Sequence, residues 1–328
     1  MAKPRVFVCR PIAKEALDKI AKETEMELWP EELPPPASLI LEKTRTADGL
    51  LSLLTDKIDA PVINAAPRLR VISNMAVGFD NIDIKEATKR HIPVGITSGV
   101  LTDTTADFAF ALLMAAARRV AEADRYTRQG KWKTWGPLVL LGQDIHHATL
   151  GIIGLGRIGK EMAKRASGFN MKVLYHDSVR CPVDEEKRLG IQYVDKLPSL
   201  LSQSDFISIH VPLTPDTRHF LGEKEFALMK PTAVLVNTSR GPVIDQKALY
   251  QALKNHKIFG AGIDVTETEP IPADDPLLTL ENIIIAPHIA SASVPTRTKM
   301  AMIAAENLLA GLRGEMPPNC ANPEALKK

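Results

Sequence analysis

Short apolar runs in the second half of the chain end, one after another, at polar residues or glycines. Runs of this length, separated by segments with helical spacing, predict buried strands of a parallel sheet. In an open parallel sheet, ligands bind beyond the carboxyl ends of the strands, so the pattern predicts a functional site at one edge. The runs and their exits are Leu150–Ile153 before Gly154–Gly159, Val173–Tyr175 before His176 and Asp177, Phe206–Ile209 before His210, Val211 and Pro212, Val234–Val236 before Asn237–Gly241, Ile263 before Asp264 and Glu269, and Ile283–Ala286 before Pro287 and His288.

The first hundred residues show the same alternation on a smaller scale. Strands and helices that alternate with short loops indicate βαβ units, and therefore a second parallel sheet. A stiff loop is expected at Glu31–Pro36, which ends in consecutive prolines. The predicted strands are Arg5–Val8, Gly49–Leu54, Leu69–Ser73 and Ile92–Ile96, and the predicted helices are Ala13–Ala21 and Ile84–Arg90.

Two longer helices flank the second sheet. Thr102–Thr105 can cap a helix from Ala106 to about Gln129, because Thr and Asp side chains accept hydrogen bonds from the N–H groups of a first turn. A terminal helix from about Val294 to Leu312 can cross back and pack on the N-terminal unit. The predicted domains are a nucleotide-binding domain of residues 102–288 and a smaller, discontinuous domain of residues 1–101 and 289–328.

Composition indicates a globular protein of about two domains. Of its 328 residues 45% are hydrophobic and 24% charged, and 41 basic and 39 acidic side chains are spread along the chain. The net charge is +2 without a basic block, which argues against nucleic acid or a membrane surface as a partner. Three scattered cysteines fit a reducing compartment. The longest apolar stretch, Phe108–Ala117, is about half of the ~20 residues that a membrane span requires. The first residues show no signal segment, so we expect a cytoplasmic protein.

The G-x-G-x-x-G run after the first strand of the second sheet is typical of a dinucleotide site. Gly154 would allow the tight turn, Gly156 the approach of a pyrophosphate, and Gly159 the packing of helix on strand. The N-terminus of the following helix would attract the phosphates. Asp177 would accept hydrogen bonds from ribose hydroxyls and repel a 2′-phosphate, which favours NAD over NADP. Arg180, three residues further on, could clamp such a phosphate, so NADP stays an alternative. An ordinary turn between strand and helix is the other interpretation of these residues.

Arg240, Glu269 and His288 each follow a strand end of one sheet and can therefore converge. Together they suit the reduction of a 2-keto acid. Arginine binds oxyanions through a planar fork, and histidine donates protons near neutral pH. A carboxylate on the other ring nitrogen would fix the tautomer and stabilise the charged imidazole. Singly, each residue has a structural interpretation; their joint placement favours a catalytic one. His210 is placed similarly, but its strand exit is more often structural. No metal-ligand spacing is present, so no metal is expected.

These motifs resemble those of the D-isomer-specific 2-hydroxyacid dehydrogenase family. The segments Gly151–Gly159, Val236–Gly241 and Ala286–Ala292 are similar to its three signatures, and the resemblance covers almost the whole chain. Within the family the chain is most similar to glyoxylate/hydroxypyruvate reductases, also called glycerate dehydrogenases. The resemblance implies an α/β fold, with a Rossmann-type doubly wound parallel sheet and a smaller flavodoxin-like α/β substrate domain. It also implies NAD, with NADP as the alternative cofactor, and a homodimer.

The resemblance further implies roles for individual residues. Hydride would pass from the nicotinamide to the carbonyl carbon of a small 2-keto acid, with glyoxylate or hydroxypyruvate favoured, giving the D-2-hydroxy acid. His288, paired with Glu269, would exchange the proton, and Arg240 would orient the substrate. The cofactor-binding residues would be Gly154, Leu155, Gly156, Arg157, Ile158, Gly159, Asp177, Val211, Pro212, Thr217, Thr238, Ser239, Asp264, Ala290 and Thr105. The substrate-binding residues would be Leu53, Ala76, Val77, Gly78, Arg240, His288 and Trp135, the last from an arm that reaches the neighbouring subunit.

Two positions depart from the commonest family pattern. Thr266 follows the pair Asp264 and Val265, at a position where family members often have an aromatic residue. His176 precedes Asp177, the acid expected to bind ribose, where tyrosine or a small residue is common. Neither removes a catalytic group. Other substrates stay open within the family: phosphoglycerate, D-lactate, a branched 2-keto acid or phosphite. Formate dehydrogenases carry glutamine in place of Glu269, which argues against them. A non-enzymatic, NAD-sensing corepressor-like binding protein is the alternative outside catalysis.

Overall fold

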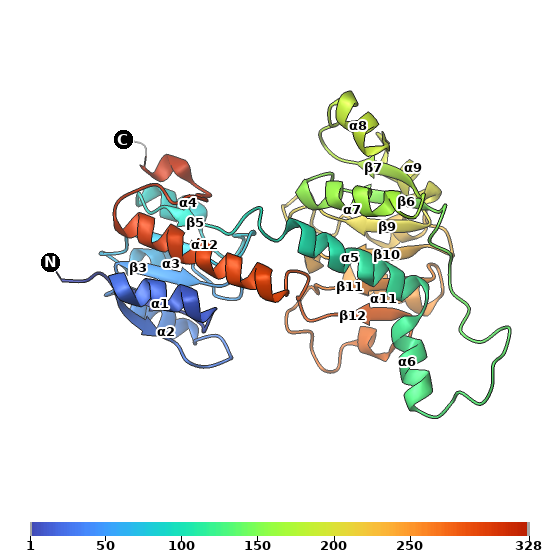
Figure 1. The fold of residues 1–328 in the computed structure, drawn as a ribbon, viewed down its shortest axis with the longest axis horizontal. Coiled ribbons are helices and arrows are strands. Elements are labelled where there is room, and N and C mark those ends of the chain that lie inside the picture. The colour runs from blue at the N-terminus through green and yellow to red at the C-terminus, as the bar shows by residue number, and fades with distance from the viewer. Residues whose placement is uncertain (1, 327–328) are drawn as a thin grey trace. The chain divides into compact units, whose positions relative to one another are not determined.

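The computed structural model describes residues 2–326, which form two compact units (Figure 1). Unit 1 takes in the described residues up to 101 and from 292 onward, and unit 2 takes in Thr102–Ser291. Unit 1 is therefore built from both ends of the chain, while unit 2 is one continuous segment. Each unit has its own parallel sheet and its own hydrophobic clusters.

Unit 1 contains a five-stranded parallel sheet in the flavodoxin-like order β2-β1-β3-β4-β5. Its strands are β1 (Arg5–Val8), β2 (Glu25–Leu28), β3 (Gly49–Ser52), β4 (Val71–Asn74) and β5 (Val94–Gly95). The sequence predicts four of these strands, but the segments predicted for β3 and β5 are longer than the strands in the structure. It misses β2, whose residues alternate between exposed and half-buried, because an edge strand of this kind has no apolar run to reveal it.

Helices pack on this sheet, and the C-terminal helix completes its core. They are α1 (Lys14–Glu23), α2 (Ala37–Thr44), α3 (Ala60–Asn64), α4 (Ile84–Lys89) and α12 (Val294–Leu312), followed by the short 3₁₀ helix η3 (Pro323–Leu326). The bounds of α12 confirm the predicted terminal helix. It packs against α1, β3 and β4 (Figure 1). Gly311 permits this approach, since a Cβ there would lie 2.4 Å from the Val71 side chain. The helices α2 and α3 are not predicted from the sequence.

Unit 2 contains a seven-stranded parallel sheet in the order β12-β11-β10-β9-β6-β7-β8. Counted from β8, this is the doubly wound order 3-2-1-4-5-6 with β12 added beyond it, so the predicted Rossmann-type sheet is confirmed. The chain changes direction across the sheet between β6 and β9, where this fold binds ligands. The strands are β6 (Thr149–Ile153), β7 (Lys172–His176), β8 (Ile191–Tyr193), β9 (Phe206–Ile209), β10 (Val234–Asn237), β11 (Gly260–Ile263) and β12 (Ile283–Ile285).

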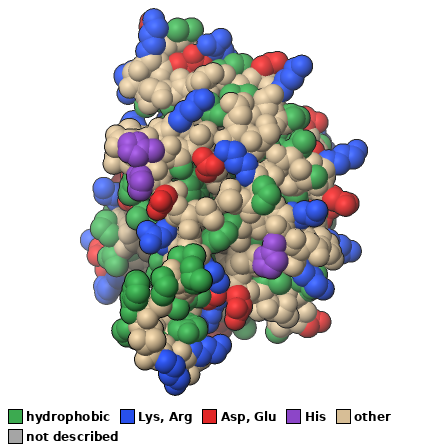
Figure 2. All heavy atoms as spheres, turned by 90° about the vertical axis from the view of Figure 1, so that its right-hand side faces the viewer, with side chains coloured by type: hydrophobic (Ala, Val, Ile, Leu, Met, Phe, Trp, Pro, Cys, Tyr) green, Lys and Arg blue, Asp and Glu red, His purple; other side chains and the backbone are tan. Residues whose placement is uncertain are grey.

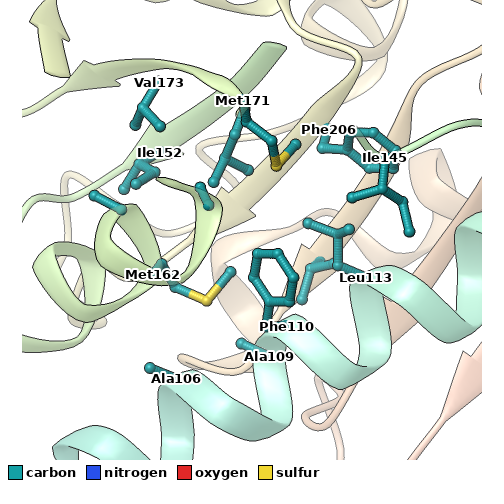
Figure 3. Close-up of a cluster of buried hydrophobic side chains, with 14 of the residues drawn as sticks. Ala106, Ala109, Phe110, Leu113, Ile145, Ile152, Met162, Met171, Val173 and Phe206 are labelled. Atoms are coloured by element: carbon teal, nitrogen blue, oxygen red, sulfur yellow. The ribbon is translucent and has the colours of Figure 1, made fainter. Parts of the chain in front are cut away.

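Both faces of the unit 2 sheet are covered. On one face, α5 packs along α7 and against β10 and β11. There Phe110 and Leu113 of α5, Met162 of α7 and Ile152 of β6 share one buried cluster (Figure 3). Ile153, next along β6, belongs to the cluster on the other face. The helices are α5 (Thr102–Ala117), α6 (Val120–Arg128), α7 (Arg157–Ser167), α8 (Val183–Leu189), α9 (Leu197–Gln203), α10 (Glu223–Phe226) and α11 (Gln246–Lys254), with the 3₁₀ helices η1 (Gly241–Val243) and η2 (Pro276–Thr279).

The single long helix predicted before this sheet is wrong, because the structure has two helices there. Thr102–Thr105 form the first turn of α5 instead of preceding it. Between α5 and α6, Arg119 has a φ of 53°. The Ala117 carbonyl at the end of α5 accepts a hydrogen bond from the Gln143 N–H at 2.9 Å. The break is thus stabilised by a segment beyond α6, and no glycine or proline marks it in the sequence.

Candidate active site

A glycine-rich turn joins β6 to α7 at the carboxyl end of the unit 2 sheet. Gly154 has a φ of 92°, and a Cβ there would lie 2.8 Å from the His210 carbonyl carbon. A Cβ on Gly159 would lie 2.3 Å from the Gly154 carbonyl oxygen. Both positions therefore require glycine, the first for its backbone conformation and the second for the approach of α7. Around Gly156, in contrast, no atom of the described residues other than its own chain neighbours lies within 4 Å of where a Cβ would be.

The open space at Gly156 fits a pyrophosphate. The helix α7 begins at Arg157, so its N-terminus lies directly at the turn. Within residues 2–326, the backbone N–H groups of Arg157 and Ile158 have no hydrogen-bond partner. Free N–H groups at a helix N-terminus attract phosphate through hydrogen bonding and the helix dipole. The residues present therefore fit a dinucleotide at this turn.

Asp177 follows β7 and lies beside the glycine-rich turn. Its Oδ2 accepts a hydrogen bond from the Leu155 N–H at 2.7 Å, and its Oδ1 accepts one from the Val179 N–H at 3.2 Å. A carboxylate held here fits the ribose hydroxyls of a dinucleotide whose pyrophosphate lies at the turn. Arg180, the alternative partner for a 2′-phosphate, donates to Glu186 instead.

The exit of β9 packs against the same turn. His210 makes a hydrogen bond between Nε2 and the Ser208 hydroxyl at 2.8 Å, and burial lowers the pKa of its imidazole to about 3. Further along, the Thr217 hydroxyl donates to the Pro212 carbonyl at 2.6 Å. This bond closes the loop that begins with Val211, so these three expected cofactor residues belong to one compact loop.

Asn237, at the end of β10, shapes the turn that carries Arg240. Its Nδ2 donates to the Arg240 carbonyl at 2.9 Å, and its Oδ1 accepts from the N–H and hydroxyl of Ser239 at 3.0 and 2.8 Å. The Thr238 hydroxyl is buried, and no hydrogen-bond partner for it lies among the described residues. Sequence reasoning missed Asn237, although asparagine before a polar turn is a signal for this bonding pattern.

Gly241 brings the Arg240 turn into contact with the loop that carries Glu269. A Cβ on Gly241 would lie 2.0 Å from the Thr266 carbonyl, so only glycine fits. Arg240 Nη1 donates to the Ser239 carbonyl at 2.8 Å. On the neighbouring loop, the Thr266 N–H donates to Glu269 Oε1 at 3.2 Å. An arginine and an acid that follow different strands thus lie on two loops in contact.

His288 and Glu269 form an acid–base pair. His288 Nδ1 lies 2.7 Å from Glu269 Oε2, with the two side chains 27% and 30% exposed. The other ring nitrogen, Nε2, has no hydrogen-bond partner in the part of the chain that the structure describes. A histidine held at Nδ1 and open at Nε2 is arranged to exchange a proton with a ligand. A second pair, His219 Nε2 with Glu267 Oε1 at 2.7 Å, was missed by sequence reasoning.

Asp264 holds the loop that carries His288. Its two carboxylate oxygens accept hydrogen bonds from the N–H groups of Ile289 and Ala290, both at 2.7 Å. Its carbonyl accepts a third, from the His288 N–H at 3.0 Å. Asp264 is buried, and this burial raises the pKa of its carboxyl group. Asp264, which is expected to bind the cofactor, therefore uses both carboxylate oxygens to hold the loop that carries His288.

In unit 1, the loop Ala76–Gly78 follows β4 at the carboxyl end of its sheet. The Ala76 carbonyl accepts a hydrogen bond from the Thr97 N–H at 2.8 Å. The N–H groups of Val77 and Gly78 have no partner among residues 2–326. Two neighbouring free N–H groups can bind one carboxylate.

The neutral side chains of Asn74 and Asn81 hold the loop Ala76–Gly78 in place. Asn74 Nδ2 donates to the Gly78 carbonyl at 3.1 Å and to Asn81 Oδ1 at 3.2 Å. Asn81 Nδ2 donates in turn to the carbonyls of Leu53 and Asp56, at 3.0 and 2.8 Å. Leu53, expected at the substrate, is thus tied to the same network. Sequence reasoning missed both asparagines.

Trp135 lies on the long segment between α6 and β6 and is 80% exposed (Figure 1). Other large apolar side chains of this segment are exposed as well, namely Trp132, Leu138, Val139 and Leu141. Figure 2, which views the side from which the segment extends, shows hydrophobic side chains gathered low on that face. Thr105, which is expected to bind the cofactor, does not belong to this segment and is buried in the first turn of α5.

Residues 2–326 contain neither a metal-binding cluster nor a membrane-spanning helix. No three His, Cys, Asp or Glu side chains are grouped so that they could hold a metal ion. Among these residues, no helix combines the length and the apolar character of a membrane span.

Comparison with known proteins places these features among dehydrogenases. Residues 110–290 match the family described as D-isomer specific 2-hydroxyacid dehydrogenase, NAD binding domain. A glyoxylate reductase of Korarchaeum cryptofilum is 60% identical over 326 residues, which cover 99% of this chain and 98% of that protein.

Solved structures agree with this relationship. A Thermus thermophilus protein is 44% identical with a TM-score of 0.91, covering 97% of this chain and 99% of the other. An NADPH-dependent glyoxylate/hydroxypyruvate reductase of Sinorhizobium meliloti, solved with NADP and malonate, is 31% identical with a TM-score of 0.87. The match covers 100% of this chain and 99% of the Sinorhizobium meliloti chain.

Proposed function

This chain belongs to the D-isomer specific 2-hydroxyacid dehydrogenase family, and we propose that it reduces glyoxylate, with hydroxypyruvate as a second substrate. It is an NAD(P)-dependent enzyme of the glyoxylate reductase type. The observation that carries the proposal is the His288–Glu269 pair, 2.7 Å apart, with the second imidazole nitrogen open. The names of the relatives support the choice of substrate. Hydroxypyruvate would be converted to D-glycerate.

Arg240, His288 and Glu269 each have a role in this reaction. Arg240 orients the acid and polarises its carbonyl group, because the guanidinium presents a planar pair of donors. His288 donates a proton from Nε2 to the carbonyl oxygen, on which negative charge develops. Glu269 fixes the tautomer and stabilises the charged imidazole. Bound NADH supplies the hydride.

We assign the substrate carboxylate to the free N–H groups of Val77 and Gly78. Backbone donors of this kind bind a carboxylate without a charged side chain. Ala76 and Leu53 complete this part of the proposal, because both are tied into the hydrogen bonds that hold the loop.

We propose that NADH is preferred over NADPH. Asp177 lies 2.7 Å from the Leu155 N–H of the glycine-rich turn, where it would repel a 2′-phosphate. Replacing Asp177 with Ala should narrow the preference, measured as the ratio of kcat/KM for the two cofactors. A wild-type ratio in favour of NADPH would refute this part.

We also propose a homodimer in which Trp135 reaches the substrate pocket of the neighbouring subunit. An exposed aromatic side chain among other exposed apolar residues is typical of an interface. Sedimentation should show a dimer, and Trp135→Ala should weaken it or raise KM. A fully active wild-type monomer would contradict this proposal.

A turnover assay tests the function as a whole. The purified enzyme is given NADH or NADPH with glyoxylate, hydroxypyruvate, pyruvate, a branched 2-keto acid and phosphohydroxypyruvate, and with phosphite plus NAD⁺. We expect the highest kcat/KM with glyoxylate and NADH. A higher value for another substrate would move the assignment within the family. No turnover with any of them would leave the catalytic roles without support.

A further inference from the structure

Arg180 lies where a cation could decide between the two nicotinamide cofactors. It stands three residues after Asp177, on the segment between β7 and α8. Its side chain is about half exposed, yet its guanidinium is bound within the protein. Nε donates to Glu186 Oε1 at 2.8 Å and Nη2 donates to Glu186 Oε2 at 2.7 Å. This bidentate arrangement is the strongest that an arginine makes with a carboxylate.

Glu186 is itself held in place. It lies in the first turn of α8 with 7% of its surface exposed, and its Oε1 accepts a further hydrogen bond from the Tyr175 hydroxyl at 2.7 Å. Tyr175 is a fully buried residue of β7, so the carboxylate is fixed to the sheet. The hydrogen bonds from Arg180 and Tyr175 hold the pKa of Glu186 at about 2, which keeps it charged at neutral pH.

The guanidinium is also fixed from its other side. It lies over the ring of Tyr193, with 5.4 Å from its central carbon to the ring centroid. A 2′-phosphate that recruited Arg180 would therefore have to break two charge-assisted hydrogen bonds. It would also leave a buried carboxylate without its cation, which is strongly unfavourable.

We propose that Glu186 is a cofactor-specificity residue that keeps Arg180 from binding a 2′-phosphate and thereby favours NAD(H) over NADP(H). The inference rests on the proposed function only for the identity of the cofactors. Asp177 repels the phosphate directly, whereas Glu186 acts by occupying the one basic side chain of the Asp177–Pro182 segment. Glu186 is thus a positioning residue, because it acts through Arg180.

The test measures binding of NADH and NADPH to the whole enzyme by calorimetry, without any turnover. In Glu186→Gln, the glutamine can still accept from Tyr175 but no longer neutralises Arg180. We expect NADPH to bind about ten- to a hundredfold more tightly, as for one new charge-assisted hydrogen bond, with NADH binding little changed. The gain should disappear in the double variant Glu186→Gln/Arg180→Gln.

Asp184→Asn is the matched control, since it removes one negative charge from the same turn of α8 at an exposed residue. We expect it to leave NADPH affinity within about twofold, because general screening by solvent weakens exposed charges. An equal gain in Asp184→Asn, or a gain that persists in the double variant, would overturn the proposal.

Arg180→Gln alone gives a second measurement that does not depend on the folding of Glu186→Gln. If Arg180 is already occupied, its loss should not weaken NADPH binding beyond any change in NADH binding. Weaker NADPH binding that persists in the double variant, where no unpaired carboxylate is left, would show that the arginine reaches the phosphate in the wild type, and would overturn the proposal. These outcomes are read from binding alone. They therefore stay separate from the turnover assay, which decides the substrate.

Discussion

The carboxyl edges of the two parallel sheets differ in which polar groups they leave open. In unit 2, the free groups of the described residues include an ionisable side chain besides the N–H groups of Arg157 and Ile158, since His288 is held at Nδ1 by Glu269 and free at Nε2. In unit 1, the charged Arg10 and Asp56 pair with each other at 3.3 Å. The groups that we assign to ligand binding there are backbone, the N–H groups of Val77 and Gly78.

The supports of the two edges differ in the same way. Unit 2 uses a buried carboxylate, Asp264, to hold the histidine loop by three hydrogen bonds that include its carbonyl. Unit 1 uses the neutral amides of Asn74 and Asn81. The difference fits our proposal that one edge moves a proton and the other holds a backbone segment that binds the substrate carboxylate. Substitutions at the two edges should therefore change different kinetic constants.

The largest effect should come from His288→Ala, which removes the proposed proton donor. We expect kcat to fall by about 10²–10⁴, the range for loss of a general acid. NADH binding should change little, since none of the backbone of the glycine-rich turn is altered. Steady-state kinetics with glyoxylate and calorimetry with NADH give the two measurements.

His219→Ala is the control for this prediction. It removes a histidine of the same unit that also contacts a glutamate at 2.7 Å. We expect only a few-fold change, as for an exposed ion pair. Equal losses in the two variants would show that the pairing itself, and not the position of His288, is what matters.

Arg240→Lys should be nearly as damaging as Arg240→Ala. Lysine keeps the charge but cannot present two parallel donors to an oxyanion. Each lost charge-assisted hydrogen bond costs about 1.5–3 kcal/mol, so kcat/KM for glyoxylate should fall by about ten- to a hundredfold or more. Arg188→Lys, at an arginine that pairs with Glu185, serves as the control. A near wild-type kcat/KM in Arg240→Lys would show that Arg240 contributes only its positive charge.

The sequence predicts the edge of unit 2 better than that of unit 1, for a physical reason. Ionisable side chains at strand ends are visible in a sequence, and Arg240, Glu269 and His288 stand out at three of them. The contact that brings their loops together is also encoded, since Gly241 is the one residue type that fits against Thr266. Free backbone N–H groups have no residue type of their own. Val77 and Gly78 were therefore named only through a family resemblance.

The misses in the fold have a similar origin. The strand β2 is half-exposed, so its pairing with β1 leaves little apolar signal. The break at Arg119 depends on a hydrogen bond from Gln143, which no local pattern shows. The role of Asp264 also depends on contacts with backbone that lies about 25 residues further along the chain.

Glu269→Gln should change the pH dependence more than the maximal rate. The glutamine can still hold Nδ1, but it no longer offers a negative charge to the imidazolium. A nearby negative charge favours the protonated ring, so its removal should make reduction of glyoxylate fall off at a lower pH. The measurement is kcat/KM against pH for both enzymes. Glu267→Gln, which touches His219 instead, should leave the profile in place. An unchanged profile in Glu269→Gln would remove this carboxylate from the proton transfer.

The smallest effect should come from Asn81→Ala, at the edge that holds backbone. Asn81 donates to the carbonyls of Leu53 and Asp56 and accepts from Asn74, which itself donates to the Gly78 carbonyl, so its loss weakens the network that holds the loop. A hydrogen bond of this kind contributes about 0.5–1.5 kcal/mol, so a loss of binding equal to one of them should raise KM for glyoxylate about three- to tenfold. The pH profile should stay where it is, because no group that moves the proton is touched.

Asn255→Ala provides a matched asparagine in unit 2, at the C-cap of α11, where the side chain bonds to Gln251 alone among residues 2–326. Thermal unfolding of both variants separates loss of stability from loss of binding. If Asn81→Ala lowered kcat and moved the pH profile while KM stayed constant, the division between a proton-moving edge and a backbone-holding edge would be wrong. If KM alone changed, the amides of unit 1 would be part of substrate recognition although none of them touches the substrate in this proposal.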